Sequence, residues 1–314
     1  MKSTSPTLPE TDTSTVAAAI VAAHAERFNG HPAATFDGFS GDAPVYRGAR
    51  QACAQLGFID IDSECLARAW QAQSERTGGF EAALWPADPR DFGLGSFPPH
   101  ARPNAFPTCP RDLGLYAVLP DATWVGRMAH AGVPTVQLRF KSEDLGAIAR
   151  EVSAAVEAVR GTDALLFIND HWQLAIEAGA YGVHLGQEDL DALTPEEVRT
   201  LRESGLRLGV STHGYAEMVR ADAVSPSYLA LGAVFPTTLK RMATAPQGLA
   251  RLHDYARLMQ GHPLVAIGGI DIERLPQALA AGVGSIAVVR AIVAAADPEG
   301  AAQSLMASMK GAGT

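Results

Sequence analysis

Cysteine is scarce in this chain of 314 residues, and its three cysteines form no recognisable motif. Cys53, Cys65 and Cys109 are an odd set in a long chain that contains no C-x-x-C sequence. These features argue against the disulfide framework of a small secreted domain. We therefore expect a reduced, cytoplasmic protein in which the thiols are ordinary residues.

The sequence also lacks a basic excess, a membrane-spanning run and a dinucleotide-binding motif, and each absence argues against one class of protein. Lysine and arginine total 25 against 34 aspartate and glutamate residues, so the formal net charge is -9 and the basic excess of a general nucleic-acid or membrane-surface binder is missing. No uncharged apolar run is long enough to span a bilayer, and residues 1–15 lack the apolar region of a signal peptide. No G-x-G-x-x-G follows the first predicted strand, which disfavours dinucleotide binding.

The composition changes near residue 110. Seven prolines lie between residues 86 and 110, a density that prevents continuous helix and predicts an extended linker or wrapping arm. Upstream, residues 16–28 and 47–76 have helical apolar spacing. We therefore predict a mainly helical N-terminal extension of unknown role over 1–85, a proline-rich linker over 86–111, and a catalytic domain over 112–314.

Eight short apolar runs alternate with helical segments after residue 112. They lack clean alternation, as expected for parallel strands that are buried on both faces. The segments between them carry helix signals, such as the capping sequence Thr194–Glu197 and a glycine before several runs. Eight strands in about 200 residues predict an α/β fold of the (β/α)8 TIM-barrel type, with a doubly wound open sheet as the alternative. The runs are 114–119, 135–140, 164–169, 181–186, 207–212, 228–234, 264–269 and 285–290.

Cationic side chains close the second run. Gln137, Arg139 and Lys141 alternate along the strand end, so they point to the same side, whereas Leu138 and Phe140 point to the other side and can pack against helices. An arginine fork and a lysine point charge at a barrel mouth suit a phosphate or diphosphate. The competing interpretation is a solvated strand end with scattered charges.

Two carboxylates close the third and fourth runs. Asp170 and Asp189 follow neighbouring strands, which lie about 5 Å apart in a barrel. They can hold one Mg²⁺ that also touches substrate phosphates, although a general acid/base pair or simple helix N-caps also explain them. We interpret His184 as a hydrogen-bonded core residue and His171 as a residue that lines the mouth without binding metal.

Later loops supply a second set of anion-binding signals. Phe235–Lys240 places hydroxyl groups and a lysine directly after the sixth run, in a loop whose alternative explanation is a plain solvated segment. Gly268 and Gly269 follow the seventh run, and Val289 and Arg290 follow the eighth. Barrels often bind phosphate between these last two loops through backbone N–H groups.

These motifs, in this order and spacing, resemble the thiamine-phosphate synthase (thiamine-phosphate pyrophosphorylase) family over roughly residues 112–305. The resemblance rests on several segments and does not extend to the N-terminal 110 residues. The segments are GLY at 114–116, QLRFK at 137–141, FIND at 167–170, GVHLGQEDL at 182–190, LGVSTH at 208–213, FPTTLK at 235–240, APQGL at 245–249, AIGGI at 266–270 and GVGSIAVV at 282–289.

The resemblance implies a transferase of thiamine biosynthesis. Such an enzyme joins 4-amino-2-methyl-5-hydroxymethylpyrimidine diphosphate to a thiazole phosphate, or its carboxylate form, and releases pyrophosphate with the help of Mg²⁺. It implies Arg139, Lys141 and Lys240 as catalytic cations and Asp170 and Asp189 as metal ligands. It further implies Gln137, Leu138, Arg139, Phe140, Lys141, Asn169, Ser211 and Lys240 at the pyrimidine diphosphate, and Thr237, Thr238, Leu239, Gly269, Val289 and Arg290 at the thiazole phosphate.

Two positions depart from the family pattern. Leu239 stands where the family usually has a second threonine, and Arg290 stands where a serine usually follows the last strand. Both departures lie on the thiazole-phosphate side, where we expect a working site of altered affinity. The rival functions are a thiazole tautomerase-like barrel and a non-catalytic thiazole-phosphate-binding regulator. The resemblance implies small-molecule partners only and a pairing of barrels by family analogy.

Overall fold

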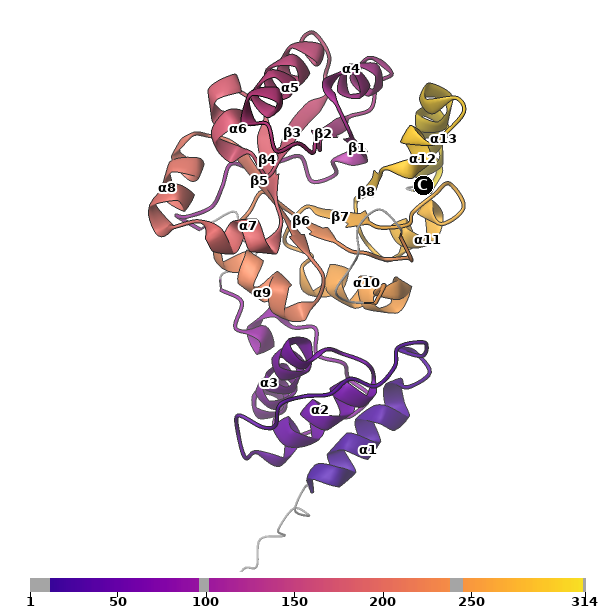
Figure 1. The fold of residues 1–314 in the computed structure, drawn as a ribbon. Helices are drawn as coiled ribbons and strands as arrows, with labels where there is room; N and C mark the ends of the chain where they lie inside the picture. Colours follow the sequence, from indigo (N-terminus) through magenta and orange to yellow (C-terminus); the bar gives the residue numbers. More distant parts are fainter. Residues whose placement is uncertain (1–11, 96–101, 238–244, 313–314) are drawn as a thin grey trace, which may run out of the picture. The chain divides into compact units, whose positions relative to one another are not determined.

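The computed structural model describes residues 12–95, 102–237 and 245–312, and the chain divides into two compact units, Met1–Leu94 and Gly95–Thr314 (Figure 1). The second unit begins earlier than the barrel domain that the sequence predicts, because the end of the proline-rich segment belongs to it. Each unit is described by itself.

Eight parallel strands form a closed barrel in sequence order, with β8 returning to pair with β1. This closure confirms the predicted (β/α)8 barrel over the open sheet. Five strands, β2, β4, β6, β7 and β8, end earlier than predicted, because the residues that follow them, such as Arg139, Gly186 and Gly268, line the barrel mouth. The strands are β1 Gly114–Leu119, β2 Thr135–Leu138, β3 Leu165–Asn169, β4 Gly182–Leu185, β5 Arg207–Thr212, β6 Tyr228–Leu231, β7 Leu264–Ile267 and β8 Ser285–Val288.

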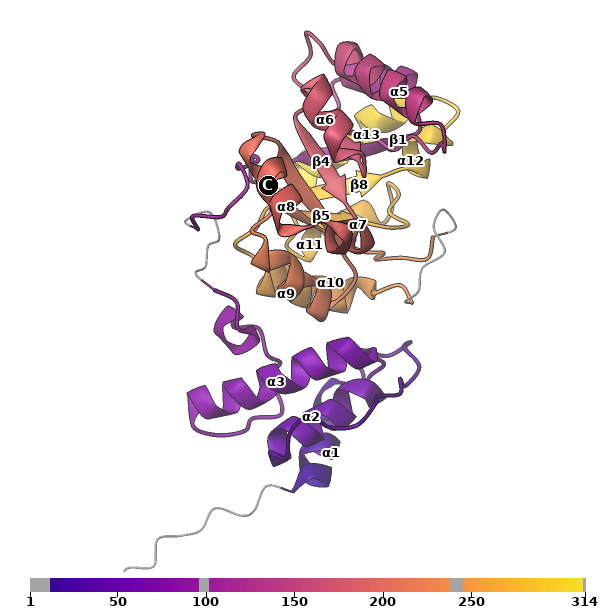
Figure 2. The same ribbon diagram turned by 60° about the vertical axis from the view of Figure 1, so that its left-hand side comes forward.

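Helices surround the barrel and connect successive strands (Figure 2). The predicted cap at Thr194 is confirmed: its hydroxyl accepts from the Glu197 N–H at 3.2 Å, and Glu197 accepts in return from the Thr194 N–H at 2.8 Å. The helices are α4 Ala122–His130, α5 Leu145–Ala158, α6 Trp172–Ala178, α7 Gln187–Ala192, α8 Pro195–Glu203, α9 Tyr215–Ala223, α10 Gly248–Leu258, α11 Leu275–Ala280, α12 Arg290–Val293 and α13 Pro298–Ala312.

Large aromatic side chains fill the barrel interior. Tyr116, Phe167 and Tyr228 are each no more than 1% exposed, and the Phe167 and Tyr228 rings meet edge to face at 5.2 Å. Leu115 and Val136 are equally buried on the helix-facing side of their strands. Burial on both faces explains why the strand sequences are almost continuously apolar.

The segment 102–113, which we call the strap, lies against the barrel unit at the ends of the strands opposite to the mouth. Arg102 forms an ion pair with Asp222 at 2.9 Å, and the Phe106 N–H donates to the Ser225 carbonyl at 3.0 Å. Phe106 is buried. The proline-rich stretch therefore ends as a packed element of the barrel unit.

The first unit contains α1 Thr13–His24, α2 Pro44–Gln55, α3 Asp60–Thr77 and the short 3-10 helix η1 Pro89–Phe92. The predicted helix over 47–76 is in fact two helices. Gly57 adopts a φ of 79°, and the Phe58 N–H donates back to the Cys53 carbonyl at 3.0 Å, the pattern of a Schellman cap. The left-handed residue ends α2, and α3 starts in a new direction.

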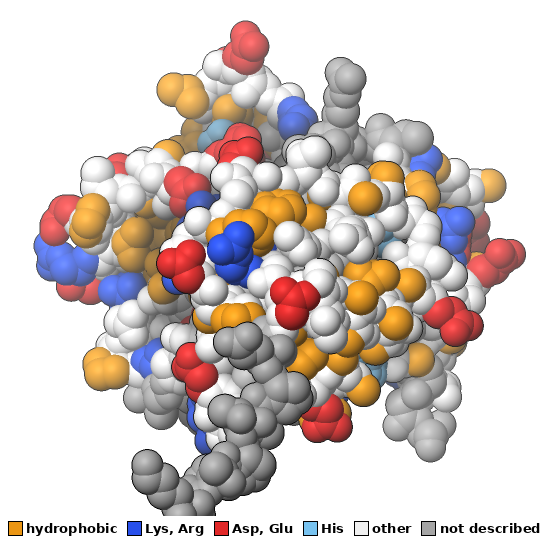
Figure 3. All heavy atoms as spheres, turned by 90° about the horizontal axis from the view of Figure 1, so that it is seen from below, with side chains coloured by type: hydrophobic (Ala, Val, Ile, Leu, Met, Phe, Trp, Pro, Cys, Tyr) orange, Lys and Arg blue, Asp and Glu red, His pale blue; other side chains and the backbone are white. Residues whose placement is uncertain are grey.

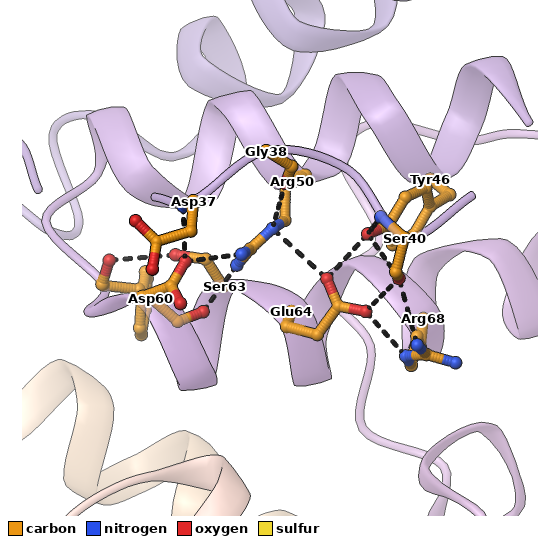
Figure 4. Close-up of polar contacts among 10 residues, drawn as sticks. Asp37, Gly38, Ser40, Tyr46, Arg50, Asp60, Ser63, Glu64 and Arg68 are labelled. Carbon is orange, nitrogen blue, oxygen red and sulfur yellow. Dashed lines mark hydrogen bonds and ion pairs between the residues drawn. The ribbon is translucent and has the colours of Figure 1, made fainter. Parts of the chain in front are cut away.

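Arg50 ties the loop before α2 to α3 in this unit (Figure 4). Its guanidinium donates to the Gly38 carbonyl at 3.3 Å and pairs with Glu64 at 3.2 Å, and it also pairs with Asp60. Tyr46 donates to Glu64 at 2.6 Å. Because each charge has a partner, the cluster is a structural tie that fixes the loop.

The surface seen from below in Figure 3 carries small groups of hydrophobic side chains, with Lys and Arg dispersed among Asp and Glu. Within the described segments, no helix is long and apolar enough to cross a membrane. All three cysteines are free thiols, and burial raises the pKa of both Cys65 and Cys109 to about 12. They are therefore poor nucleophiles, as expected for ordinary residues.

Candidate active site at the barrel mouth

A cavity of about 630 Å³ opens at the carboxyl ends of the strands, and every strand contributes to its wall. Side chains that are far apart in the sequence meet here because parallel strands present the same ends to one mouth. The residues with a predicted role that line the cavity are Gln137, Arg139, Lys141, Asn169, Asp170, Asp189, Ser211, Thr237, Gly269, Val289 and Arg290.

Five residues with a predicted role are absent from that wall or cannot be placed. Leu138 is buried at 2% exposure and Phe140 is half-buried, and neither lines the cavity. Their side chains alternate with those of Gln137, Arg139 and Lys141, so they point away from the cavity and hold the segment on its other side. Thr238, Leu239 and Lys240 lie outside the described residues.

Two amide side chains meet on the cavity wall. The Gln137 Nε2 donates to the Asn169 Oδ1 at 2.7 Å, across the neighbouring strands β2 and β3. This bond fixes the orientation of both amides, since each must present one defined end to its partner. Among the described residues, the Gln137 side-chain carbonyl and the Asn169 amino group form no other hydrogen bond, and both residues line the cavity.

Asp170 holds a carboxylate in an unusual backbone conformation. Its φ is 65°, a left-handed value that aspartate tolerates better than most residues, and its N–H donates to the His184 carbonyl at 3.0 Å. Burial, followed by the charge and hydrogen bond of Asp189, raises the pKa of Asp170 to about 6. The nearby Arg139 and Lys141 partly oppose this shift. Two carboxylates are thus held together at a cost that a bound cation would relieve.

Helix capping explains only one of these carboxylates. One Asp189 oxygen, Oδ2, accepts from the Gly186 N–H at 3.2 Å at the start of α7. The N-cap of α6 is His171, so Asp170 caps no helix. His171 is half-buried and does not line the cavity, contrary to its predicted place at the mouth, because its main chain turns into α6.

Arg139 and Lys141 supply positive charge beside the carboxylates. Arg139 is half-buried and Lys141 is exposed. The Arg139 N–H extends the strand ladder by donating to the Leu119 carbonyl at 2.8 Å, which anchors the start of the loop. Both charges are close enough to Asp170 to lower its pKa, and both side chains line the same cavity.

The opposite wall is built from tight glycine turns. Gly269 has a φ of 65°, and a Cβ placed there would lie 2.6 Å from the Pro236 carbonyl oxygen, so only glycine fits between the loops after β6 and β7. Val289 and Arg290 follow β8 at the start of α12. Backbone N–H groups of these loops can therefore approach an anion closely.

Several cavity residues were missed by sequence reasoning. Arg274 donates to the Gly269 carbonyl at 2.8 Å and lies over the Phe235 ring, but its position five residues after the glycine carries no motif. Tyr228 faces the cavity from β6, and the strand register is needed to reveal this. His184 is a hydrogen-bonded buried residue as predicted, and it also lines the cavity.

Comparisons with known proteins agree on one family. The family model described as thiamine monophosphate synthase matches residues 115–292. The thiamine-phosphate synthase of Neisseria meningitidis serogroup B is 51% identical over 206 residues, which cover 66% of this chain and 99% of that protein. The thiamine-phosphate synthase of Yersinia pestis is 48% identical over 206 residues, with 66% and 94% coverage.

A solved structure supports the same assignment. The thiamine phosphate pyrophosphorylase from Pyrococcus furiosus superposes with a TM-score of 0.57 at 28% identity, and the match covers 64% of this chain and 98% of that one. The matched family region contains almost the whole barrel and the cavity residues from Tyr116 to Arg290. This chain therefore belongs to the thiamine monophosphate synthase family.

Proposed function

We propose that this chain joins 4-amino-2-methyl-5-hydroxymethylpyrimidine diphosphate to 4-methyl-5-(2-phosphoethyl)-thiazole, or its carboxylate form, to give thiamine phosphate and pyrophosphate. The observation that carries the proposal is the meeting of Arg139, Lys141, Asp170 and Asp189 in one cavity of the barrel. A diphosphate needs both cations and a metal site, and a ligand with a single phosphate does not. We also propose that the reaction takes place in the cytoplasm.

The pyrimidine diphosphate would lie along β2 and β3. The paired amides of Gln137 and Asn169 offer an acceptor and donors that match an aminopyrimidine. Arg139 and Lys141 would bind the diphosphate oxygens, together with Ser211 and, from the sequence pattern, Lys240. Leu138 and Phe140 would act by holding this segment in place.

Mg²⁺ would be held by Asp170 and Asp189. The described residues contain no group of three or more His, Cys, Asp or Glu side chains that could hold a metal ion. A pair of carboxylates still suits Mg²⁺, which keeps several waters and takes its other oxygens from substrate phosphates. When bound, Mg²⁺ would neutralise charge on the departing diphosphate.

The chemistry needs no enzyme nucleophile. Breaking the C–O bond leaves positive charge on the pyrimidine methylene, which the amino-substituted ring delocalises, and negative charge on pyrophosphate. Arg139, Lys141 and Lys240 would stabilise that negative charge. The thiazole nitrogen then forms the new C–N bond, positioned by its phosphate near Thr237, Thr238, Leu239, Gly269, Val289 and Arg290.

One assay tests the proposal. Purified protein is mixed with both phosphorylated substrates, with and without Mg²⁺, and thiamine phosphate and pyrophosphate are measured. We expect both products in equal amounts and only with Mg²⁺. Binding of the thiazole phosphate without product would indicate a regulator, and turnover of a thiazole carboxylate phosphate alone would indicate a tautomerase.

Leu239 gives a prediction about the thiazole side. Replacing it by threonine restores the hydroxyl that the family pattern has at this position, so the KM for the thiazole phosphate should fall at least about tenfold, as expected for one hydrogen bond to a charged group. Leu239→Val is the matched control, because valine has the shape of threonine without its hydroxyl. Equal KM values for the two variants would show that the missing hydroxyl is irrelevant.

A further inference from the structure

Four polar groups form a hydrogen-bonded chain from the barrel interior to the cavity. The Tyr116 and Tyr228 hydroxyls are 2.8 Å apart, the Tyr228 hydroxyl is 2.7 Å from the His184 Nδ1, and the His184 Nε2 is 2.8 Å from the Ser211 Oγ. The groups come from β1, β6, β4 and β5. All four side chains border the cavity, but Tyr116 and Tyr228 are no more than 1% exposed whereas Ser211 is half-buried, so the hydrogen-bonded chain crosses the barrel from a buried end to a more open one.

The position of Tyr228 in this chain depends on Gly209. A Cβ at this position of β5 would lie 2.1 Å from the Tyr228 Cζ, so only glycine leaves room for the tyrosine ring. Tyr116 and Tyr228 are fully buried, and this burial raises the pKa of both hydroxyls. Each tyrosine therefore keeps a proton that needs an acceptor.

The direction of the chain follows from its buried end. Among the described residues, the Tyr116 hydroxyl has one hydrogen-bond partner, the Tyr228 oxygen. If Tyr228 donated to Tyr116, the proton of this tyrosine, which is 1% exposed, would have no acceptor among the described residues, which is unfavourable. Tyr116 must therefore donate to Tyr228, and Tyr228 must donate to the His184 Nδ1.

The remaining steps follow from the two imidazole nitrogens. A neutral histidine that accepts at Nδ1 carries its proton on Nε2, so His184 donates to the Ser211 oxygen. The Ser211 proton cannot then point at His184, and it is left to donate into the cavity. If the hydrogen bonds ran in the opposite direction, Ser211 would donate its proton to His184 and could only accept hydrogen bonds from a ligand.

We propose that Tyr228 and His184 are positioning residues that turn the Ser211 hydroxyl into a hydrogen-bond donor for an anionic oxygen of the pyrimidine diphosphate. This inference rests on the proposed function for the identity of the ligand. A donor fixed before the substrate arrives stabilises the negative charge that grows on the departing diphosphate and needs no reorientation during the reaction.

The direction of the hydrogen-bonded chain can be tested with a matched pair of variants, Tyr228→Phe and Tyr116→Phe. In Tyr228→Phe, His184 loses its partner at Nδ1, so both tautomers become accessible and Ser211 can turn its proton toward Nε2. In Tyr116→Phe, the Tyr228 proton still has the His184 Nδ1 as its acceptor, so the direction is kept. Both variants remove one hydroxyl from the same buried core.

The first measurement is the tautomer of His184 in the full-length protein without substrates. Nitrogen-15 NMR of histidine-labelled protein, assigned with His184→Gln, should show the Nε2–H tautomer in the wild type and in Tyr116→Phe. Tyr228→Phe should show a mixture. An Nδ1–H tautomer in the wild type, or the same result in both tyrosine variants, would overturn the inference whether or not the protein is active.

The second measurement is steady-state kinetics with both substrates. Tyr228→Phe should lower kcat and kcat/KM for the pyrimidine diphosphate about tenfold, and Tyr116→Phe should stay within about twofold of the wild type. Ser211→Ala should lose at least as much activity as Tyr228→Phe. Adding Tyr228→Phe to Ser211→Ala should cause no further loss, because the tyrosine acts through the serine.

A purely structural role for Tyr228 would give a different result. The activity losses of Tyr228→Phe and Ser211→Ala would then multiply, and this outcome overturns the inference. Thermal unfolding of each variant shows whether the fold is intact. An inactive wild-type protein would refute the proposed function, and the tautomer measurement would still decide the direction of the chain.

Discussion

Replacing Asp170 with asparagine should lower turnover about a thousandfold, because the variant loses half of the carboxylate pair that we propose as the Mg²⁺ site. Asparagine keeps the size of the side chain and tolerates the φ of 65° that alanine would adopt with strain. The measurement is the rate of thiamine phosphate formation at saturating Mg²⁺. Added Mg²⁺ should not restore the rate.

The same variant should be more stable than the wild type in the absence of metal. Burial and Asp189 raise the pKa of Asp170 to about 6, so the folded state disfavours the charged carboxylate. This cost is fully present above about pH 6 and disappears as the pH falls toward the unfolded value near 4. Because Asp170 is exposed to solvent, screening reduces the gain at pH 7.5 to about 1 kcal/mol, or about 2–4 °C in Tm.

Asp163→Asn is the matched control for both measurements. Asp163 is exposed and precedes β3, whereas Asp170 follows the same strand. Neither activity nor the pH dependence of Tm should change in this control. Normal turnover of Asp170→Asn would contradict the metal-site assignment. An increased Tm of the same variant would still support the conclusion that Asp170 and Asp189 repel each other in the folded state.

Sequence reasoning was most successful where a residue's role depends on its place along a strand. Asp170 and Arg139 could be placed because they end buried apolar runs, and parallel strands bring such ends together in any barrel. The cap at Thr194 follows from local chemistry alone. These features are local in the sequence, so a single chain is enough to predict them.

The rest of the site depends on which side chains share the inside of the barrel. Tyr116 and Tyr228 are 112 residues apart and meet only because of the strand register, which apolar runs without alternation do not encode. Arg274 reaches the cavity from a turn that has no motif. The break at Gly57 was missed because helix propensity is high on both sides of it.

The sequence also did not locate the start of the barrel unit. The position of this start determines which fragment of the chain should be stable. From the sequence, we expect a fragment of residues 111–314 to fold by itself, with insolubility as the alternative if apolar surface under the proline-rich arm is exposed. The structure shows that such a fragment lacks most of the strap. It loses the Thr108 and Pro107 carbonyls, which accept from Arg207 and Ser227.

The charged end of the strap explains the size of the expected effect. Asp222 is 3% exposed and is bound by Arg102 and by the His262 Nε2 at 2.8 Å. Burial alone would raise the pKa of Asp222, but the hydrogen bonds from His262 and Arg102 hold it below its usual value. Removing Arg102 leaves a buried carboxylate with one partner, a loss of about 3 kcal/mol. Loss of the buried Phe106 costs about 2 kcal/mol more.

We therefore expect two barrel fragments to behave differently. Residues 95–314 retain the whole strap, and relatives of barrel length such as the Neisseria protein lack an equivalent of the first unit, so this fragment should fold and keep full activity. Residues 111–314 should lose about 5 kcal/mol, a large part of the stability of a typical domain, and should melt more than about 10 °C lower or aggregate.

Thermal unfolding and activity of the two fragments provide the comparison, and Arg102→Gln in the full-length chain isolates the ion pair from the rest of the strap. That variant should lose about 3 kcal/mol and remain folded. Equal melting temperatures for the two fragments would show that the strap is only a linker. Loss of activity in the 95–314 fragment, with its melting temperature unchanged, would instead indicate that the first unit takes part in the function of the barrel.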